Sequence, residues 1–264
     1  CIEFSLKTGD NVQLFAQEWR AVPAPKAVVV LIHGLGEHCN RYNHVAAAFN
    51  ASNINVLALD LRGHGKSPGT RGHIPGYTVA AEDIDLLISE AVRRYPAAPV
   101  FLYGHSLGGA LVLYYMLTHK SQLKGVIATS PGLVPANPPT GGTLLFAKVA
   151  SKLAPSLVID NSLDRTGLAR DPQVEKIYSA DPLVHGKISA KLGFDLIQNG
   201  QYILQHASEI SIPLLLMVGN ADRLVNPAAV RQLASIAPKN KITYKEWDGY
   251  YHELHNEPEK QEVI

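Results

Sequence analysis

The sequence predicts an α/β protein with a mostly parallel central sheet, helices on both faces of that sheet and an inserted helical cap. Two features of the chain carry this prediction. Short, mostly continuous apolar runs recur along it, and strands that are buried on both faces have this pattern. Segments with apolar residues at helical spacing separate these runs, and such an alternation is typical of right-handed βαβ units.

The chain opens with two strand-like segments, 2–6 and 12–19, which flank a turn at 8–11 and predict an antiparallel hairpin. The apolar runs that follow predict buried strands at 28–32, 55–59, 100–103, 125–128 and 213–218, and a further strand is predicted at 242–247. Helical spacing predicts helices at 45–49, 79–95, 109–119 and 228–236.

The stretch 132–206 interrupts this rhythm. It contains proline-rich turns and apolar helical patterns but no convincing strand. We therefore predict that it is a cap, inserted between two strands of a core that consists of residues 1–131 and 207–264.

The composition indicates a globular protein and excludes several classes of partner. Of the 264 residues, 46% are hydrophobic and 18% are charged, which supplies enough apolar side chain for a large core. Lys and Arg number 24 against 23 Asp and Glu, so the net charge of +1 gives no electrostatic case for nucleic-acid binding. No apolar run approaches the roughly 20 residues that cross a bilayer. We expect a cytoplasmic or peripherally membrane-associated protein.

A G-x-S-x-G motif occupies residues 104–108, with Ser106 at its centre. It follows the predicted strand at 100–103 and precedes the predicted helix at 109–119. This is the strand-turn-helix context of the nucleophile elbow in the α/β-hydrolase fold. The glycines allow the strained turn that presents the serine hydroxyl above the sheet. Ser106 is therefore the predicted nucleophile.

An oxyanion that forms when a serine attacks a carbonyl needs two hydrogen-bond donors. The residue after the nucleophile supplies one of them in this fold, which here is the amide of Leu107. The second donor comes from an early strand-to-helix loop, and the segment 33–36 follows the predicted strand at 28–32. We predict the Leu35 amide as this donor, with an ordinary glycine-rich turn as the alternative.

A serine hydroxyl needs a base, and the base needs a carboxylate that fixes its tautomer. In this fold the chain order is serine, acid, histidine. Asp222 follows the predicted strand at 213–218, and His252 follows the predicted strand at 242–247. We predict these two as acid and base. Asp248 and His255 are the alternatives.

Eleven histidines raise the question of a metal site. The segment 252–255 is similar to the zinc motif H-E-x-x-H, but its two histidines lie three positions apart and the motif requires four. We therefore expect no metal site, and the predicted chemistry needs no cofactor.

Taken together, these motifs resemble those of monoacylglycerol lipases, in the α/β-hydrolase group that also includes lysophospholipases. The resemblance covers nearly the whole chain. It rests on segments 33–38, 60–67, 104–109 and 252–255, together with Arg41, Tyr42 and Asp222. Members of this family continue into a full C-terminal helix, so the resemblance implies such a helix beyond Ile264.

The resemblance implies hydrolysis of monoacylglycerol esters through an acyl-enzyme, with a small lipid as the partner. It also implies that the cap covers an apolar acyl channel and that polar residues hold the glycerol head group. The matching positions are Glu37, Arg41, Asn137, Tyr178 and His255. Glu37 and Arg41 could instead pair with each other, and Tyr178 could pack within the cap.

Other activities share the same three residues. A lysophospholipase or a general carboxylesterase differs from a monoacylglycerol lipase in pocket shape and head-group contacts. An acyltransferase would use the same acyl-enzyme. A binding module without catalysis is the remaining alternative, and the presence of all three catalytic residues argues against it.

Within the cap, Leu145, Val149 and Leu153 recur at a spacing of four residues, with Phe146 and Ala150 beside them. This spacing gives an apolar stripe along one helix. The stripe either packs onto the body of the protein or lies partly exposed and makes transient contact with membranes or lipid aggregates.

Overall fold

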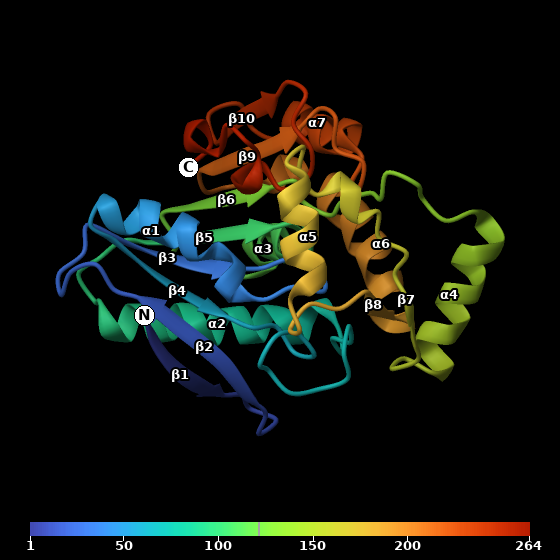
Figure 1. Ribbon diagram of the computed structural model, residues 1–264, viewed down its shortest axis with the longest axis horizontal. Helices are drawn as coiled ribbons and strands as arrows, with labels where there is room; N and C mark the ends of the chain where they lie inside the picture. The colour runs from blue at the N-terminus through green and yellow to red at the C-terminus, as the bar shows by residue number, and fades with distance from the viewer. Residues whose placement is uncertain (121) are drawn as a thin grey trace.

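The computed structural model describes residues 1–120 and 122–264 and contains an eight-stranded sheet (Figure 1). The strand order is β1-β2-β4-β3-β5-β6-β9-β10. β1 pairs antiparallel with β2 and β2 with β4, whereas the remaining neighbours are parallel. The strands are β1 Ile2–Lys7, β2 Gln13–Trp19, β3 Ala27–Ile32, β4 Ile54–Leu59, β5 Val100–His105, β6 Gly125–Thr129, β9 Leu214–Gly219 and β10 Ile242–Trp247. The predicted hairpin and all predicted strands are confirmed.

Helices cover both faces of this sheet. α2, α3 and α7 pack against one face, and α1 covers part of the other. The four helices are α1 Asn43–Ala51, α2 Tyr77–Arg94, α3 Leu107–Thr118 and α7 Pro227–Ile236. α1 and α7 contain the predicted helical segments completely, and α2 and α3 each end one residue before the predicted end. The predicted α/β-hydrolase architecture is therefore confirmed.

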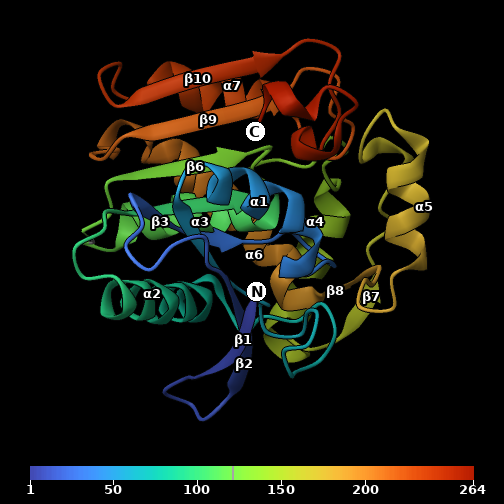
Figure 2. The ribbon, with the colours of Figure 1, turned by 60° about the vertical axis from the view of Figure 1, so that its left-hand side comes forward.

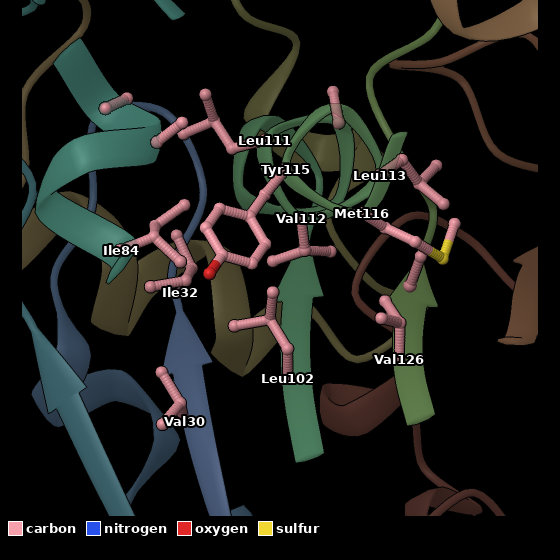
Figure 3. Packing of buried hydrophobic residues seen from close by; sticks show 14 of the residues in the cluster. Val30, Ile32, Ile84, Leu102, Leu111, Val112, Leu113, Tyr115, Met116 and Val126 are labelled. Atoms are coloured by element: carbon pink, nitrogen blue, oxygen red, sulfur yellow. The ribbon is translucent and has the colours of Figure 1, made fainter. Parts of the chain in front are cut away.

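The central strands read as uninterrupted apolar runs because both of their faces are buried. Along β3, Val30 and its alternate neighbours belong to the core cluster shared with α2 and α3, while Leu31 belongs to the cluster shared with α1. Figure 3 shows the first cluster, in which Leu102 of β5 lies below Val112 and Tyr115 of α3. Successive side chains of a strand point to opposite faces, so a strand between two helical layers needs apolar residues at every position.

The segment between β6 and β9 contains the predicted cap. Its elements are α4 Gly141–Leu153, β7 Val158–Asp160, the 3-10 helix η2 Arg165–Gly167, α5 Pro172–Ala180, β8 Lys187–Ser189, α6 Ala190–Gln205 and, after the predicted cap, the 3-10 helix η3 Ala207–Glu209. The expectation of no strand here is wrong, because β7 and β8 form a short antiparallel pair. Each has three residues, which is too few to show a period of two in the sequence.

The last α-helix of this segment packs with the body of the protein. α6 contacts α3 and α7, and its Leu192 and Ile203 are fully buried in the main core cluster. α6 therefore packs as part of the core, although the predicted cap includes it. Figure 2 shows α5, β7 and β8 beyond the ends toward which the parallel strands point.

The apolar stripe on α4 is exposed. The exposed fractions of Leu145, Phe146, Val149 and Leu153 are 63%, 66%, 47% and 81%, whereas Ala150 is buried. Figure 1 shows α4 at the outer edge of the molecule. The stripe therefore does not pack onto the body of the protein. Within the described part of the chain, no helix is both long and apolar enough to cross a membrane.

The packing of β5 against α3 predicts the stability of one variant. Leu102→Ala removes a side chain with no exposed surface and should lower the free energy of unfolding by roughly 2–5 kcal/mol, because a cavity remains. Urea denaturation measures this change. Val92→Ala is the matched control, since Val92 is 42% exposed on α2 and should shift stability by no more than about 0.5 kcal/mol. Equal losses in the two variants would contradict the assignment of Leu102 to the core.

Candidate active site

Ser106 lies at the turn between the last residue of β5 and the first residue of α3. Its backbone has φ +53° and ψ −115°, in a region that side-chain-bearing residues rarely occupy. Two glycines make this turn possible. A Cβ on Gly104 would lie 2.2 Å from the Gly108 carbonyl oxygen, and one on Gly108 would lie 2.2 Å from the Ile32 carbonyl oxygen. The strand-turn-helix elbow therefore forms where the motif predicts it.

The structure brings the three predicted catalytic side chains into hydrogen-bonding contact. His252 Nε2 lies 2.8 Å from Ser106 Oγ, and His252 Nδ1 lies 2.7 Å from Asp222 Oδ2. The other carboxylate oxygen of Asp222 accepts hydrogen bonds from the amides of Leu224 and Val225, at 2.8 and 3.0 Å. These amides fix the carboxylate, and the carboxylate places the Nδ1 proton so that Nε2 is free to accept the serine proton.

The surroundings of His252 favour its protonated form. Burial lowers the pKa of this imidazole, but the charge and hydrogen bond of Asp222 outweigh burial and raise the pKa above its ordinary value. Glu253 and Glu37 act in the same direction. An imidazole in this setting can accept a proton from Ser106 in the attack step and hold it until the leaving group takes it.

The structure does not bring the alternative acid and base to Ser106. Asp248 is exposed and accepts a hydrogen bond from the Asn220 side chain at 2.8 Å. His255 is 1% exposed and stacks on Tyr42, with ring centroids 4.9 Å apart. Burial holds the pKa of His255 well below its ordinary value. Among the described residues, no group of three or more His, Cys, Asp and Glu side chains is placed to hold a metal ion.

The predicted oxyanion-hole residues flank the nucleophile. Leu107 is the first residue of α3, where backbone amides have no partner within the helix. The loop that contains Leu35 approaches from β3, and a Cβ on Gly34 would lie 3.3 Å from the Cβ of Ser106. Leu35 and Leu107 both line the cavity in front of Ser106. Two backbone amides are thus available on the two sides of the serine.

A cavity of about 130 Å³ opens onto Ser106 and His252. Most of its wall is apolar. The apolar residues come from the core around the sheet and from the segment between β6 and β9. The apolar lining residues are Leu35, Leu107, Pro135, Leu163, Leu168, Leu196, Leu224 and Val225, and Gly34 and Gly132 complete this part. Glu37, Tyr178 and Glu253 form a polar part of the wall, beside His105. The cavity therefore offers an apolar surface and a polar surface to one molecule held at Ser106.

Of the five predicted head-group residues, Glu37 and Tyr178 line this cavity, whereas Arg41, Asn137 and His255 do not. The Arg41 guanidinium is held by Glu37 and Glu253. Asn137 is exposed to solvent. The head-group roles of these three residues therefore stay predictions.

Glu253 lines the cavity and was missed by the sequence analysis. It is 2% exposed, directly follows His252 in the chain, and accepts two hydrogen bonds from Arg41. The available signal was its position beside the predicted base, together with an arginine near the predicted oxyanion loop. That signal is weak, because 212 positions separate Glu253 from Arg41.

Comparison with known proteins shows the family of this chain. The profile of the family described as "Serine aminopeptidase, S33" matches residues 23–259. A monoacylglycerol lipase of Mycolicibacterium smegmatis is 36% identical over 99% of this chain and 94% of its own length. An uncharacterized abhydrolase domain-containing protein of Dictyostelium discoideum is 39% identical over 98% of this chain, which spans 28% of that protein's length.

A solved structure extends the likeness to three dimensions. The monoacylglycerol lipase of Paleococcus ferrophilus superposes with a TM-score of 0.87 and 37% identity, and the match covers 95% of each chain. The resemblance drawn from the motifs is thereby confirmed. The chain belongs to the serine aminopeptidase S33 family, within the monoacylglycerol lipase group of α/β-hydrolases.

Proposed function

We propose that this protein hydrolyses monoacylglycerols to a fatty acid and glycerol through an acyl-enzyme on Ser106. The observation that carries the proposal is the hydrogen-bonded series Ser106, His252 and Asp222, which faces a cavity with one apolar and one polar surface. The monoacylglycerol lipases among the relatives support the choice of substrate.

The geometry gives a role to each atom. Ser106 Oγ attacks the ester carbonyl carbon while His252 Nε2 takes its proton, and the amides of Leu35 and Leu107 donate to the oxyanion. The tetrahedral intermediate collapses, the bond to the glycerol oxygen breaks, and His252 gives its proton to that oxygen. A water molecule then attacks the acyl-enzyme by the same steps, and Ser106 recovers its proton when the fatty acid leaves.

The charge of the polar surface favours an uncharged leaving group. Glu37 and Glu253 lie on this surface, and among the described residues that line the cavity none is Lys or Arg. Arg41 pairs with both carboxylates, but two negative charges and one positive charge leave this group with a net negative charge. A phosphate on the leaving alcohol would be repelled by that charge, because charge interactions are strong in a poorly solvated site. Glycerol carries only hydroxyl groups. This favours monoacylglycerol over the lysophospholipid alternative.

The exposed face of α4 is suited to a lipid surface. Four apolar side chains lie on it, and the same helix carries Lys148 and Lys152 but no acidic residue. Lysines beside a row of large apolar side chains are typical of helices that lie at a membrane interface. We propose that α4 rests on membranes or lipid aggregates. This contact would hold the predicted cap at the lipid phase from which monoacylglycerol enters the cavity.

Removal of the nucleophile should abolish ester hydrolysis. Ser106→Ala is expected to lower kcat on a p-nitrophenyl ester by roughly 10⁴-fold or more, because only binding and the oxyanion donors remain. Ser235→Ala, at an exposed serine of α7, is the control and should keep full activity. Full activity in Ser106→Ala would refute the assigned nucleophile.

The head-group argument predicts an order of substrates with the same acyl chain. We expect kcat/KM for monooleoylglycerol to exceed that for oleoyl-lysophosphatidylcholine by at least about tenfold, which corresponds to roughly 1.4 kcal/mol. Oleoyl-lysophosphatidate, whose headgroup has the greater net negative charge, should be the poorest of the three. Equal or faster hydrolysis of the two phospholipids would point to the lysophospholipase alternative.

The α4 proposal predicts a loss of membrane binding. Leu145→Asp combined with Val149→Asp should reduce liposome flotation several-fold, because two charges then face the apolar interface. Val92→Asp with Ile236→Asp is the matched control, since these exposed apolar residues lie on α2 and α7. Flotation that is unchanged by the α4 pair would remove the proposal.

A further inference from the structure

We infer that Glu253 is a positioning residue that, through Arg41, fixes the loop of the catalytic base to the loop of the oxyanion hole. The inference rests on the proposed ester hydrolysis. It assigns Glu253 and Arg41 to the geometry of the catalytic site and not to contact with the glycerol head group.

Glu253, the residue after His252, connects the loop of the catalytic base to Arg41. The Glu253 carboxylate accepts hydrogen bonds from Arg41 Nη1 and Nη2 at 2.7 and 2.8 Å, and its Oε2 also accepts one from Asn256 Nδ2 at 2.7 Å. The two-pronged contact with a guanidinium fixes both the distance and the orientation of a carboxylate. The peptide that joins His252 to Glu253 is thereby tied to Arg41.

Arg41 also connects to the loop of the oxyanion hole, through Glu37. Arg41 Nη1 also donates to Glu37 Oε2. The other oxygen of Glu37 accepts hydrogen bonds from the Gly34 amide at 2.6 Å and from the Tyr42 hydroxyl at 2.7 Å. Gly34 lies against Ser106 and directly precedes Leu35, so the position of the proposed oxyanion donor depends on Glu37.

The side chains of this link are buried. Glu37 and Glu253 are each 2% exposed, and the Arg41 side chain is 9% exposed. Tyr178 of α5 covers the guanidinium, with its ring centroid 4.6 Å from Arg41 Cζ. Burial raises the pKa of Glu253, but Arg41 outweighs burial and holds that pKa well below its usual range. Both carboxylates need the same guanidinium as partner, because a buried charge without a partner is strongly unfavourable.

A link of this kind matters for the rate because the nucleophile, the base and the oxyanion donors come from segments that are far apart in the chain. Asp222 orients the ring of His252, but it does not determine where the oxyanion loop lies relative to that ring. The Glu37, Arg41 and Glu253 contacts do so. A displacement of about 1 Å between groups that act together can reduce a rate by roughly 100-fold.

The test variant is Glu253→Gln, which keeps the shape of the side chain. A glutamine has one carbonyl oxygen, so it cannot accept from both nitrogens of Arg41 and also from Asn256. We expect kcat on a p-nitrophenyl ester to fall roughly 10- to 100-fold per active site titrated with a fluorophosphonate, with KM changed less than about threefold. Glu246→Gln is the control, because it alters a carboxylate paired with Arg231 on the surface.

The same variant should change the pH profile. Asp222, Glu253, Glu37 and the ring of His105 face His252, and the first three raise its pKa. Loss of one negative charge should therefore move the acid limb of kcat/KM to lower pH, because the imidazole then loses its proton at lower pH. A carboxylate whose charge does not reach the base, such as Glu246, would leave the position of this limb unchanged when it is replaced by glutamine.

Arg41→Lys tests the guanidinium that pairs with both carboxylates. It also tests the inference if Glu253→Gln does not fold. A lysine is a point charge that cannot hold both carboxylates in the same geometry, so kcat should fall to a similar extent. The double variant should lose little more than either single variant, because both act through one link.

A comparison of two substrates distinguishes a positioning role of Glu253 from contact with the head group. The p-nitrophenol leaving group has no glycerol hydroxyls, so a loss that is confined to monoacylglycerol and to KM would overturn the inference and assign Glu253 to the head group. A value of kcat within about twofold of the unaltered enzyme would overturn it as well. Failure of the proposed function would instead appear in the unaltered enzyme, as slow hydrolysis of monoacylglycerol.

Discussion

The active site depends on one steric constraint, which is the close approach of α3 to β5 and β3 at the elbow. The first turn of α3 comes so near to both strands that a single Cβ at Gly104 or Gly108 would overlap a backbone oxygen. This packing holds Ser106 at a positive φ, with its hydroxyl above the end of the sheet. The buried strands around it supply the rigidity, since a strained residue persists only where its surroundings determine its conformation.

Buried charge is the second constraint on the site. Three carboxylates, those of Asp222, Glu37 and Glu253, lie close enough to raise the pKa of His252. Each is satisfied by neighbouring donors: backbone amides for Asp222, and Arg41 together with other groups for the two glutamates. The protein therefore surrounds the base with negative charge while leaving none of these carboxylates without a partner, which a dry site would not tolerate.

The segment between β6 and β9 supplies apolar residues both to the cavity and to the surface of the molecule. Leu163 and Leu168 turn inward and complete the apolar wall of the cavity, while the large apolar residues of α4 face outward. One segment of the chain therefore supplies apolar surface both to the cavity and to the outside of the molecule.

The sequence by itself determined the local features of this protein. Apolar runs located the five buried parallel strands β3, β4, β5, β6 and β9, and the glycines around Ser106 predicted the elbow, because strand burial and tight turns leave their signal within a few adjacent residues. Only the tertiary structure decided which of two acids and two histidines reach the serine, that Arg41 turns toward Glu253, and that α6 packs with the body. These outcomes depend on distances between segments far apart in the chain, and such distances are set by the packing of many elements at once.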